Sequence, residues 1–579
     1  MACAAQNFFW QSSLAWLQSL LLGLLFCGSH SNLIAQANEL VFARDIAPII
    51  IQNCSQCHRP GEPAPFSLLN YNDVFKHRDQ VLEVIESGIM PPWMPAPQKH
   101  RFANERRLPP EAITKVKQWI INGAPEGNPE DLPPLPHWVQ GWSLGEPDLI
   151  LTLPQPYEMS AEGTDIYRNF VFPVSITNHQ QVAGLEFRPG NGKVVHHAFI
   201  RIDSTHGSRS RDAGDPEPGF SGLHAPGTMP PEGFFASWQP GKTASRYPQG
   251  LSWTLHPGED LVVQTHLRHS GKPEKVQPQI GIYFTKSQPK TIPLKLYLQT
   301  TQIKIPAGSS NYSVTDKLTL PVDVAVIGIL PHAHYLARSV TVTAFGQSGS
   351  PEQLLNIPRW DFNWQGDYTY EKPVFLSRGS TIEMHWTYDN SSANPNNPSN
   401  PPRDVHYGLQ STDEMAEVWL QVLVRSKADY DQLDAVVSKR IVTDTIAYNE
   451  FILKAEPTNA TAWFELGKAL TLNSQPGRAE ESFKKSLELK PSAEACFNLG
   501  LLMEMQNRVT DAQKAYEQCL ALEPDNYLAH NNLGLILLNQ NKLEEAISHF
   551  RRAVEFSHGD TLPRENLELA LSRKKSTEQ

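Results

Sequence analysis

The feature of this chain that most restricts its fold is an internal repeat of 33 or 34 residues near the C-terminus. Glycine, proline and aromatic residues recur at that step: Gly467, Gly500 and Gly534; Pro457, Pro491 and Pro524; Phe483, Tyr516 and Phe550. Alanine recurs as well, at Ala479, Ala512 and Ala546, where closely packed helices need a small side chain. A period of this length predicts stacked helix pairs, each covering the apolar face of the next.

The repeat resembles the tetratricopeptide repeats and predicts a helical solenoid of at least three helix pairs over residues 447–575, beginning near Ala447. We expect such an array to bind a protein or peptide partner, and a purely structural cap is the alternative. Cys496 and Cys519 fall on the two helices of one repeat. They are predicted to be buried apolar residues rather than redox partners.

The rest of the chain must form further domains, because 579 residues exceed what one hydrophobic core usually supports. Hydrophobic residues make up 40% and charged residues 19%, which is typical of folded globular proteins. The net charge of −11 indicates no basic surface, so nucleic acid is not an expected partner.

The first 37 residues have the pattern of a secretory signal peptide. The apolar run from Leu14 to Gly28 is short for a membrane span, and Ala35-Gln36-Ala37 supplies the small residues of a cleavage site. Lipidation at Cys27 is disfavoured, because Phe26 stands where a small residue is needed. We therefore expect a periplasmic or secreted protein.

Cys54-Ser55-Gln56-Cys57-His58 is the pentapeptide that attaches a c-type haem. Cys54 and Cys57 would bind the haem covalently, and His58 would be its proximal iron ligand. A zinc site is the alternative, but the sequence has no second pair of closely spaced cysteines to complete one. The pattern predicts one covalent haem.

Helices are predicted at Phe42–Gln52 and Pro110–Ile121, on either side of the residues that would enclose the haem. This arrangement predicts a small all-α cytochrome c domain over residues 38–126. Met90 is the expected distal ligand, since Met90-Pro91-Pro92-Trp93 resembles a segment of cytochrome c modules. Met94, His77 and His100 are the alternatives.

A proline-rich linker at 127–145 leads to β-branched runs separated by Gly, Pro and Asn, which predict two antiparallel β-sandwiches at 146–288 and 289–428. Potential ligands of a soft metal lie in four short segments of this region: His196 and His197, His266, His332 and His334, and Met415. Five imidazoles and one thioether suit copper in both of its oxidation states. Zinc seldom recruits methionine.

The spacing of these histidines makes two different geometric demands. His332 and His334 are two residues apart in a strand-like context, so their side chains should point to one face. His196 and His197 are neighbours, whose side chains point to opposite faces of a regular strand. Both can reach one ion only at a β-bulge or a strand end.

The four segments, in this order, resemble the copper type II, ascorbate-dependent monooxygenases, the family of peptidylglycine α-hydroxylating and dopamine β-monooxygenases, over residues 146–428. The resemblance includes two neighbouring residues, Gln264 and His406, as second-shell positions. It implies two copper ions. The electron-supplying copper would bind His196, His197 and His266, and the O2-activating copper would bind His332, His334 and Met415, the expected catalytic residues.

The resemblance further implies hydroxylation of a C–H bond of an organic substrate by O2, with release of water. Relatives that amidate peptides hold the substrate carboxylate with Arg, Asn and Tyr, where this chain has Leu330, Glu417 and Trp419. A carboxylate would be repelled by Glu417, so a glycine-extended peptide is not the expected substrate. Other histidines nearby are predicted to be structural or solvated: His224, His256, His269 and His385.

Two functional hypotheses follow. In the first, the chain is a copper-dependent monooxygenase whose electrons pass through the c-type haem, an ascorbate-like small reductant, or both, with an electron-donor protein as a further partner. In the second, the chain is a non-enzymatic copper-binding electron-transfer module that the repeats display to protein partners. The residues Asp389 to Arg403 form either a loop over the second copper or a plain surface loop.

Overall fold

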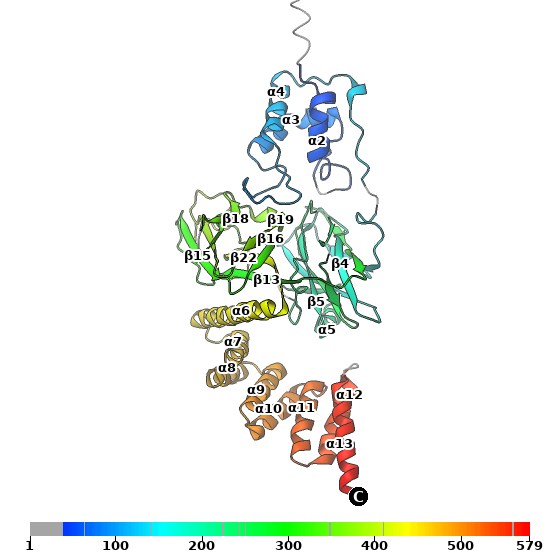
Figure 1. Cartoon of the computed structure of the whole chain (residues 1–579), viewed down its shortest axis with the longest axis vertical. Coiled ribbons are helices and arrows are strands. Elements are labelled where there is room, and N and C mark those ends of the chain that lie inside the picture. The colour runs from blue at the N-terminus through cyan, green and yellow to red at the C-terminus, as the bar shows by residue number, and fades with distance from the viewer. Residues whose placement is uncertain are drawn as a thin grey trace, which may run out of the picture.

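A computed structural model describes residues 39–578, except 63, 139–140, 223–224, 243, 249, 347–348, 409 and 558–560. The predicted signal peptide lies outside these residues. Figure 1 shows an N-terminal helical domain above a central β-rich region, and a helical array below it that ends at the C-terminus. Within the described part of the chain, no helix combines the length and apolar character that crossing a membrane requires.

The N-terminal domain packs three α-helices behind a short π-helical turn, η1 (Phe42–Ile46): α2 (Ala47–Asn53), α3 (Tyr71–Glu86) and α4 (Pro110–Ile121). The two helices predicted from the sequence are confirmed by η1 with α2 and by α4, whereas α3 was not predicted. Asn70 caps α3 by accepting the backbone N–H of Asp73. The core of the domain includes Phe42, Ile46, Val116 and Trp119.

The first β unit consists of two antiparallel sheets with an apolar core between them. One sheet has the order β1 (Leu149–Thr152), β12 (Gln279–Thr285), β4 (Gln180–Arg188) and β8 (Ser245–Arg246), and β9 (Trp253–Leu255) also pairs with β4. The other has the order β6 (Phe220–Ser221), β3 (Ile166–Pro173), β10 (Asp260–Leu267), β5 (Val195–Asp203) and β7 (Ser237–Trp238). Smaller elements are β2 (Tyr157–Met159), β11 (Glu274–Val276) and α5 (Gly207–Gly214).

The second β unit repeats this plan with two four-stranded sheets. The first contains β13 (Ile292–Gln299), β22 (Glu417–Val424), β16 (Val324–His332) and β19 (Tyr368–Leu376). The second contains β15 (Tyr312–Thr319), β20 (Thr381–Tyr388), β17 (Ala337–Phe345) and β18 (Glu352–Ile357), and β14 (Lys304–Ile305) pairs with β21 (Val405–His406). Burial alternates residue by residue along β20 and β22, as expected for strands with one face on a core.

Helical structure begins earlier in the chain than the sequence predicted. Helix α6 spans Lys427–Ala455, so the expectation that helix starts near Ala447 was wrong. The first half of α6 packs on the second β unit and has no glycine at the repeat positions, which is why the period did not reveal it. The following helices are α7 (Ala460–Leu472), α8 (Pro476–Leu489), α9 (Ala493–Met505), α10 (Val509–Leu522), α11 (Tyr527–Asn539), α12 (Leu543–Phe556) and α13 (Leu562–Glu578).

The recurring glycines and aromatic residues meet inside each helix pair. A Cβ added to Gly467 would lie 2.7 Å from the ring of Phe483, and one added to Gly500 would lie 2.5 Å from the ring of Tyr516. The repeating alanines, Ala479, Ala512 and Ala546, are fully buried. The 33- or 34-residue period therefore records the closest contacts between the paired helices.

The N-terminal domain packs directly on the second β unit. Phe102 forms a β-bridge with Tyr370, and their rings stack with centroids 4.8 Å apart. The backbone N–H of Ala96 donates to the carbonyl of Asn356 at 2.7 Å. These contacts fix the N-terminal domain on the β-rich region.

Candidate metal centres

Three of the predicted copper ligands come together in one sheet of the first β unit. His196 and His197 lie on β5, and His266 lies opposite them on β10. In the ladder between these strands His266 pairs with His197, while the next residue, Leu267, pairs with Val195. His196 is thus the extra residue of a β-bulge, and the local distortion that its position demanded is present.

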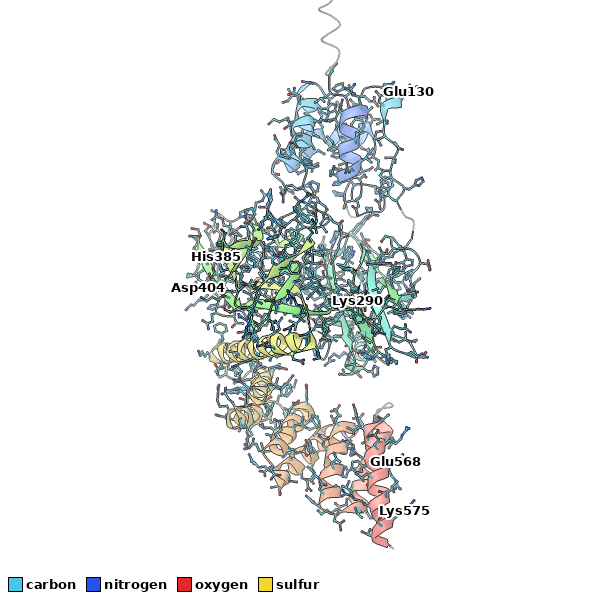
Figure 2. The ribbon with its side chains drawn as sticks, viewed as in Figure 1. Glu130, Lys290, His385, Asp404, Glu568 and Lys575 are labelled. Carbon is cyan, nitrogen blue, oxygen red and sulfur yellow. The ribbon has the colours of Figure 1, made fainter. Side chains whose placement is uncertain are left out.

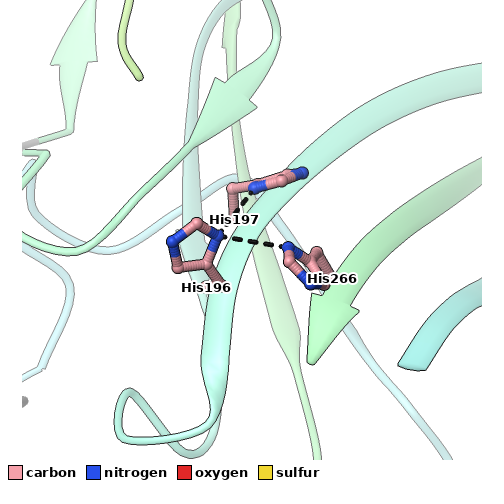
Figure 3. Close-up of side chains that lie close together, drawn as sticks. All are labelled: His196, His197 and His266. Atoms are coloured by element: carbon pink, nitrogen blue, oxygen red, sulfur yellow. Dashed lines mark hydrogen bonds between the residues drawn. The ribbon is translucent and has the colours of Figure 1, made fainter. Parts of the chain in front are cut away.

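The ligand nitrogens of this cluster, named the first cluster, converge on one point (Figure 3). Nδ1 of His196 lies 3.1 Å from Nδ1 of His197 and 3.2 Å from Nδ1 of His266. Nitrogens that bind one ion at about 2.0–2.1 Å lie roughly 3 to 3.5 Å apart. The spacing therefore fits a single metal ion.

Asp165 and the surrounding apolar residues set the protonation of the first cluster. The Asp165 carboxylate accepts from Nε2 of His266 at 2.8 Å, which leaves the His266 Nδ1 lone pair facing the cluster. Burial lowers the pKa of His196 to about 4 and holds the pKa of His197 well below its usual value. Neutral imidazoles are the form in which histidine binds a metal.

His332, His334 and Met415, named the second cluster, all lie in the second β unit. His332 ends β16, and His334 lies just beyond it with the two ring centroids 5.3 Å apart. Nδ1 of His332 contacts Oε1 of Gln365 at 2.5 Å, and Nδ1 of His334 contacts the carbonyl of Asp413 at 3.1 Å. Both contacts leave Nε2 for a ligand role.

Buried Glu414 brings Met415 to the histidines. One carboxylate oxygen accepts the backbone N–H of His334 at 3.0 Å and that of Met415 at 3.1 Å, and the other oxygen accepts the N–H of Leu336. Burial raises the pKa of Glu414 to about 8, although these N–H bonds act in the opposite direction. Met415 is 7% exposed and belongs to the same core as Leu336.

One histidine of each cluster lines the same small cleft. His197 and His332 both line a cavity of about 30 Å³, together with Leu330 and Trp238. The ring of Phe362, in the short helix η3 (Phe362–Trp364), lies 6.2 Å from the ring of His196 and 5.8 Å from that of His334. The ring centroids of His196 and His334 therefore lie no farther apart than these two distances added together.

The haem-binding motif begins where α2 ends. Cys54 caps α2, and the backbone N–H of His58 donates to its carbonyl at 2.9 Å. Nδ1 of His58 bonds to the carbonyl of Phe66 at 3.1 Å, which leaves Nε2 for an iron. Burial raises the pKa of Cys54 to about 12 and also raises that of Cys57. The donor set fits a covalent haem with one axial histidine.

The alternative distal ligands make different contacts. Sδ of Met94 accepts the N–H of Asp361, and His100 contacts Glu352 at 2.8 Å, so both residues join the domain to the second β unit. His77 stacks on Phe66 with centroids 3.9 Å apart. Met90 is half-buried just after α3.

The two predicted second-shell residues differ in their placement. Gln264 lies on β10 two residues before His266 and thus on the same face of the strand. The ring of His406 lies 5.9 Å from that of Phe451 in α6, and its carbonyl accepts the N–H of Glu414, the residue before Met415. Its second-shell role stays a prediction.

The sequence reading missed the groups that orient the ligands, namely Asp165, Gln365, Glu414 and Phe362. An acidic residue next to Met415 was visible in the sequence, but burial of its carboxylate against the backbone of His334 depends on the tertiary fold.

Of the histidines predicted to be structural, His385 bonds Thr315 across β20 and β15 at the edge of the molecule (Figure 2). His224 lies outside the described residues.

Comparisons with known proteins identify the C-terminal array. The family model described as tetratricopeptide repeat matches residues 446–494 and 497–560. Two crystal structures of MamA are similar to the chain: one is 28% identical and covers 24% of this chain and 83% of MamA, and the other is 27% identical and covers 24% and 78%. Both TM-scores are 0.23, too low to support a structural argument. No curated protein matches the chain. The C-terminal helices thus form a tetratricopeptide-like array, a fold that indicates a protein partner.

Proposed function

We propose that the chain is an exported copper-dependent monooxygenase that hydroxylates a C–H bond of an organic substrate with O2. The observation that carries the proposal is the gathering of three imidazoles, those of His196, His197 and His266, beside a cleft that His197 shares with His332 of the second cluster. Nitrogen ligands serve both oxidation states of copper, and the thioether favours the reduced one. Two copper ions, when bound, would supply the one-electron chemistry that O2 activation requires.

The protein's own residues hold each ligand in one orientation. Asp165, Gln365 and the carbonyl of Asp413 each bond one ring nitrogen of a histidine, and such partners fix both tautomer and ring direction. The buried ring of Phe362 places an apolar group near His196 of one cluster and His334 of the other.

The walls of the cleft argue for a substrate without a carboxylate at this point. Leu330 lines the cleft beside His332, and Glu417 pairs with His332 across β16 and β22. Trp419 donates to Glu417 at 3.3 Å, and burial raises the pKa of this carboxyl group. A substrate carboxylate would meet an apolar side chain and an acidic group.

The N-terminal domain would supply electrons through a covalent haem bound by Cys54, Cys57, His58 and Met90. A small reductant such as ascorbate, or an electron-donor protein, would reduce the haem, the copper, or both. The signal-peptide pattern supports a periplasmic or secreted location. In that setting the tetratricopeptide array would hold the enzyme to a protein or peptide partner.

The test begins with metal and haem analysis of the purified full chain, for which we expect two copper ions and one haem. An untargeted search for products that gain one oxygen atom follows. Met415→Ala should abolish the product and leave copper at the first cluster, while the control His385→Ala should change neither. A chain that purifies with zinc alone would contradict the proposal.

The narrowness of the cleft favours a second candidate function. The cavity that His197 and His332 line measures about 30 Å³, which is room for roughly one water molecule. In this function the chain would be a non-enzymatic copper and electron carrier. Full copper loading without oxygen consumption on any substrate class would favour the carrier.

A further inference from the structure

A large cavity lies where three parts of the molecule meet. It has a volume of about 810 Å³, and its wall contains Cys57 and its neighbours in the N-terminal domain, the first β unit, and Ile327 and Thr369 of the second β unit. The expected axial ligands of the haem, His58 and Met90, are not among the described residues of this wall. The cavity, named the chamber, is therefore distinct from the space between those two ligands that a haem would occupy.

The first β unit gives the chamber an apolar wall. Its side chains belong to the core of that unit or pack on it, and they include the aromatic rings of Phe187, Phe234 and Tyr247. The rings of Phe234 and Tyr247 have centroids 4.4 Å apart, and Ile200 and Leu251 extend the apolar surface. A cavity of about 300–1,000 Å³ with a mainly apolar and aromatic wall is typical of a site for a small organic molecule.

The charged groups at the domain junction already have partners. Arg59 forms an ion pair with Glu62 at 2.7 Å. Lys242 forms an ion pair with Asp367, whose carboxylate also accepts from the hydroxyl of Ser237 at 2.7 Å. These groups neutralise one another, so they offer no spare charge to a ligand.

The other charged groups of the wall are engaged as well. Glu186 accepts the backbone N–H of Ser143 at 2.8 Å and contacts Arg188 at 3.4 Å, while the guanidinium of Arg246 lies 4.7 Å from the centroid of the Tyr283 ring. Every carboxylate in the described part of the wall thus has a donor. A cationic ligand would find no counter-charge, and an anion would find only an arginine that an aromatic face already holds. Moving a charge from water to such a wall costs free energy.

The chamber adjoins the metal clusters. Ser237 and Asp367 line both the chamber and the small cleft that His197 and His332 share. The cleft has room for roughly one water molecule, so the chamber is the adjoining space that can hold an organic molecule.

We propose that the chamber binds an uncharged, largely apolar organic molecule, and that this is the substrate class of the copper centres. The second part rests on the proposed function, whereas the binding itself requires no turnover. The apolar wall takes up the body of the ligand, and a few polar side chains, such as that of Gln421, orient it.

The experiment measures binding by titration calorimetry on the full chain loaded with haem and copper. Three probes of nearly the same shape are compared: naphthamide, which is neutral, the anion naphthoate and the cation naphthylmethylammonium. Two variants fill the chamber from different walls, namely Ala236→Trp in the first β unit and Thr369→Trp, at an exposed position of β19. The control Thr319→Trp changes an exposed threonine of β15 that is not part of the wall. Haem absorption and circular dichroism verify that each variant folds.

We expect one naphthamide to bind per chain, about tenfold or more tightly than either ion. Ala236→Trp and Thr369→Trp should each weaken its binding by about tenfold or more, and Thr319→Trp should leave it unchanged. Naphthamide binding that is absent from the native chain, or equal in the native chain and both wall variants, would overturn the site. Tighter binding of either ion would overturn the ligand class.

The substrate assignment has its own test in the search for products that gain one oxygen atom. Neutral, apolar products would support it, whereas products that are all charged would overturn it and leave the binding site standing. Missing copper in the metal analysis would refute the proposed function, and the substrate assignment with it. Binding of naphthamide would still establish the chamber as a site for an apolar molecule.

Discussion

Replacing Gly500 by alanine should destabilise the tetratricopeptide array. The added Cβ would lie 2.5 Å from Cε1 and 2.8 Å from Cδ1 of Tyr516, well inside van der Waals contact. The ring cannot move away freely, because Tyr516 is fully buried and its hydroxyl bonds to Glu504 and Asn532. Overpacking of this kind costs about 1–3 kcal/mol, while alanine in place of glycine gains about 1 kcal/mol in helix propensity. The clash outweighs this gain unless the pair relaxes fully.

Gly477→Ala is the matched control, since Gly477 lies in helix α8 of the same array and has no heavy atom within 4 Å of an added Cβ. This variant should gain up to about 1 kcal/mol of stability. The free energies of unfolding of the two variants should therefore differ by roughly 1–3 kcal/mol. For a unit of this size each kcal/mol shifts Tm by about 2–4 °C. Thermal unfolding of the full chain, followed by circular dichroism at the helix band, measures the shift. If Gly500→Ala unfolds at or above the temperature of Gly477→Ala, the close contact does not explain the repeat.

Two other perturbations test the metal centres and the array. Asp165→Asn should weaken copper binding at the first cluster by about 10–100-fold, because the amide no longer fixes the tautomer of His266; copper titration of the chain against the control Asp404→Asn measures it. In the array, Nδ1 of His530 lies 2.8 Å from Nδ1 of His549, and burial lowers the pKa of both. Since the unfolded histidines bind protons more readily, stability should be constant above about pH 6.5 and fall below it. Thermal unfolding between pH 7 and pH 5 checks this, and His549→Gln should flatten the dependence; an unchanged profile would contradict it.

The sequence predicted those parts of the structure that follow from local pattern. The period of 33 or 34 residues located the paired helices from α7 onward, because the same glycine–ring contact recurs in every pair. It did not locate the first half of α6, which packs on a β-sheet and is under no repeat constraint. Helix α3 was missed for a related reason: half of its residues are polar and its apolar face is narrow.

The sequence predicted which three histidines gather in the first cluster, but not the groups that orient them. Two adjacent histidines required a bulge, and the ladder between β5 and β10 contains one at His196. The groups that orient the ligands lie far away in sequence: Asp165 stands 101 residues from His266, and Gln365 stands 33 residues from His332. No spacing rule connects such residues.

Helix α6 determines how a partner on the array would be placed relative to the metal clusters. Leu433 and Val437, in its first half, belong to the core of the second β unit, whereas Ile446 and Leu453 belong to the core of the array. Tyr297 on β13 donates to Asp444 at 2.7 Å near the middle of the helix. One continuous helix of 29 residues thus joins two cores without a flexible linker. A partner bound by the repeats would therefore be held at a fixed position relative to the cleft, as delivery of a substrate or an electron requires.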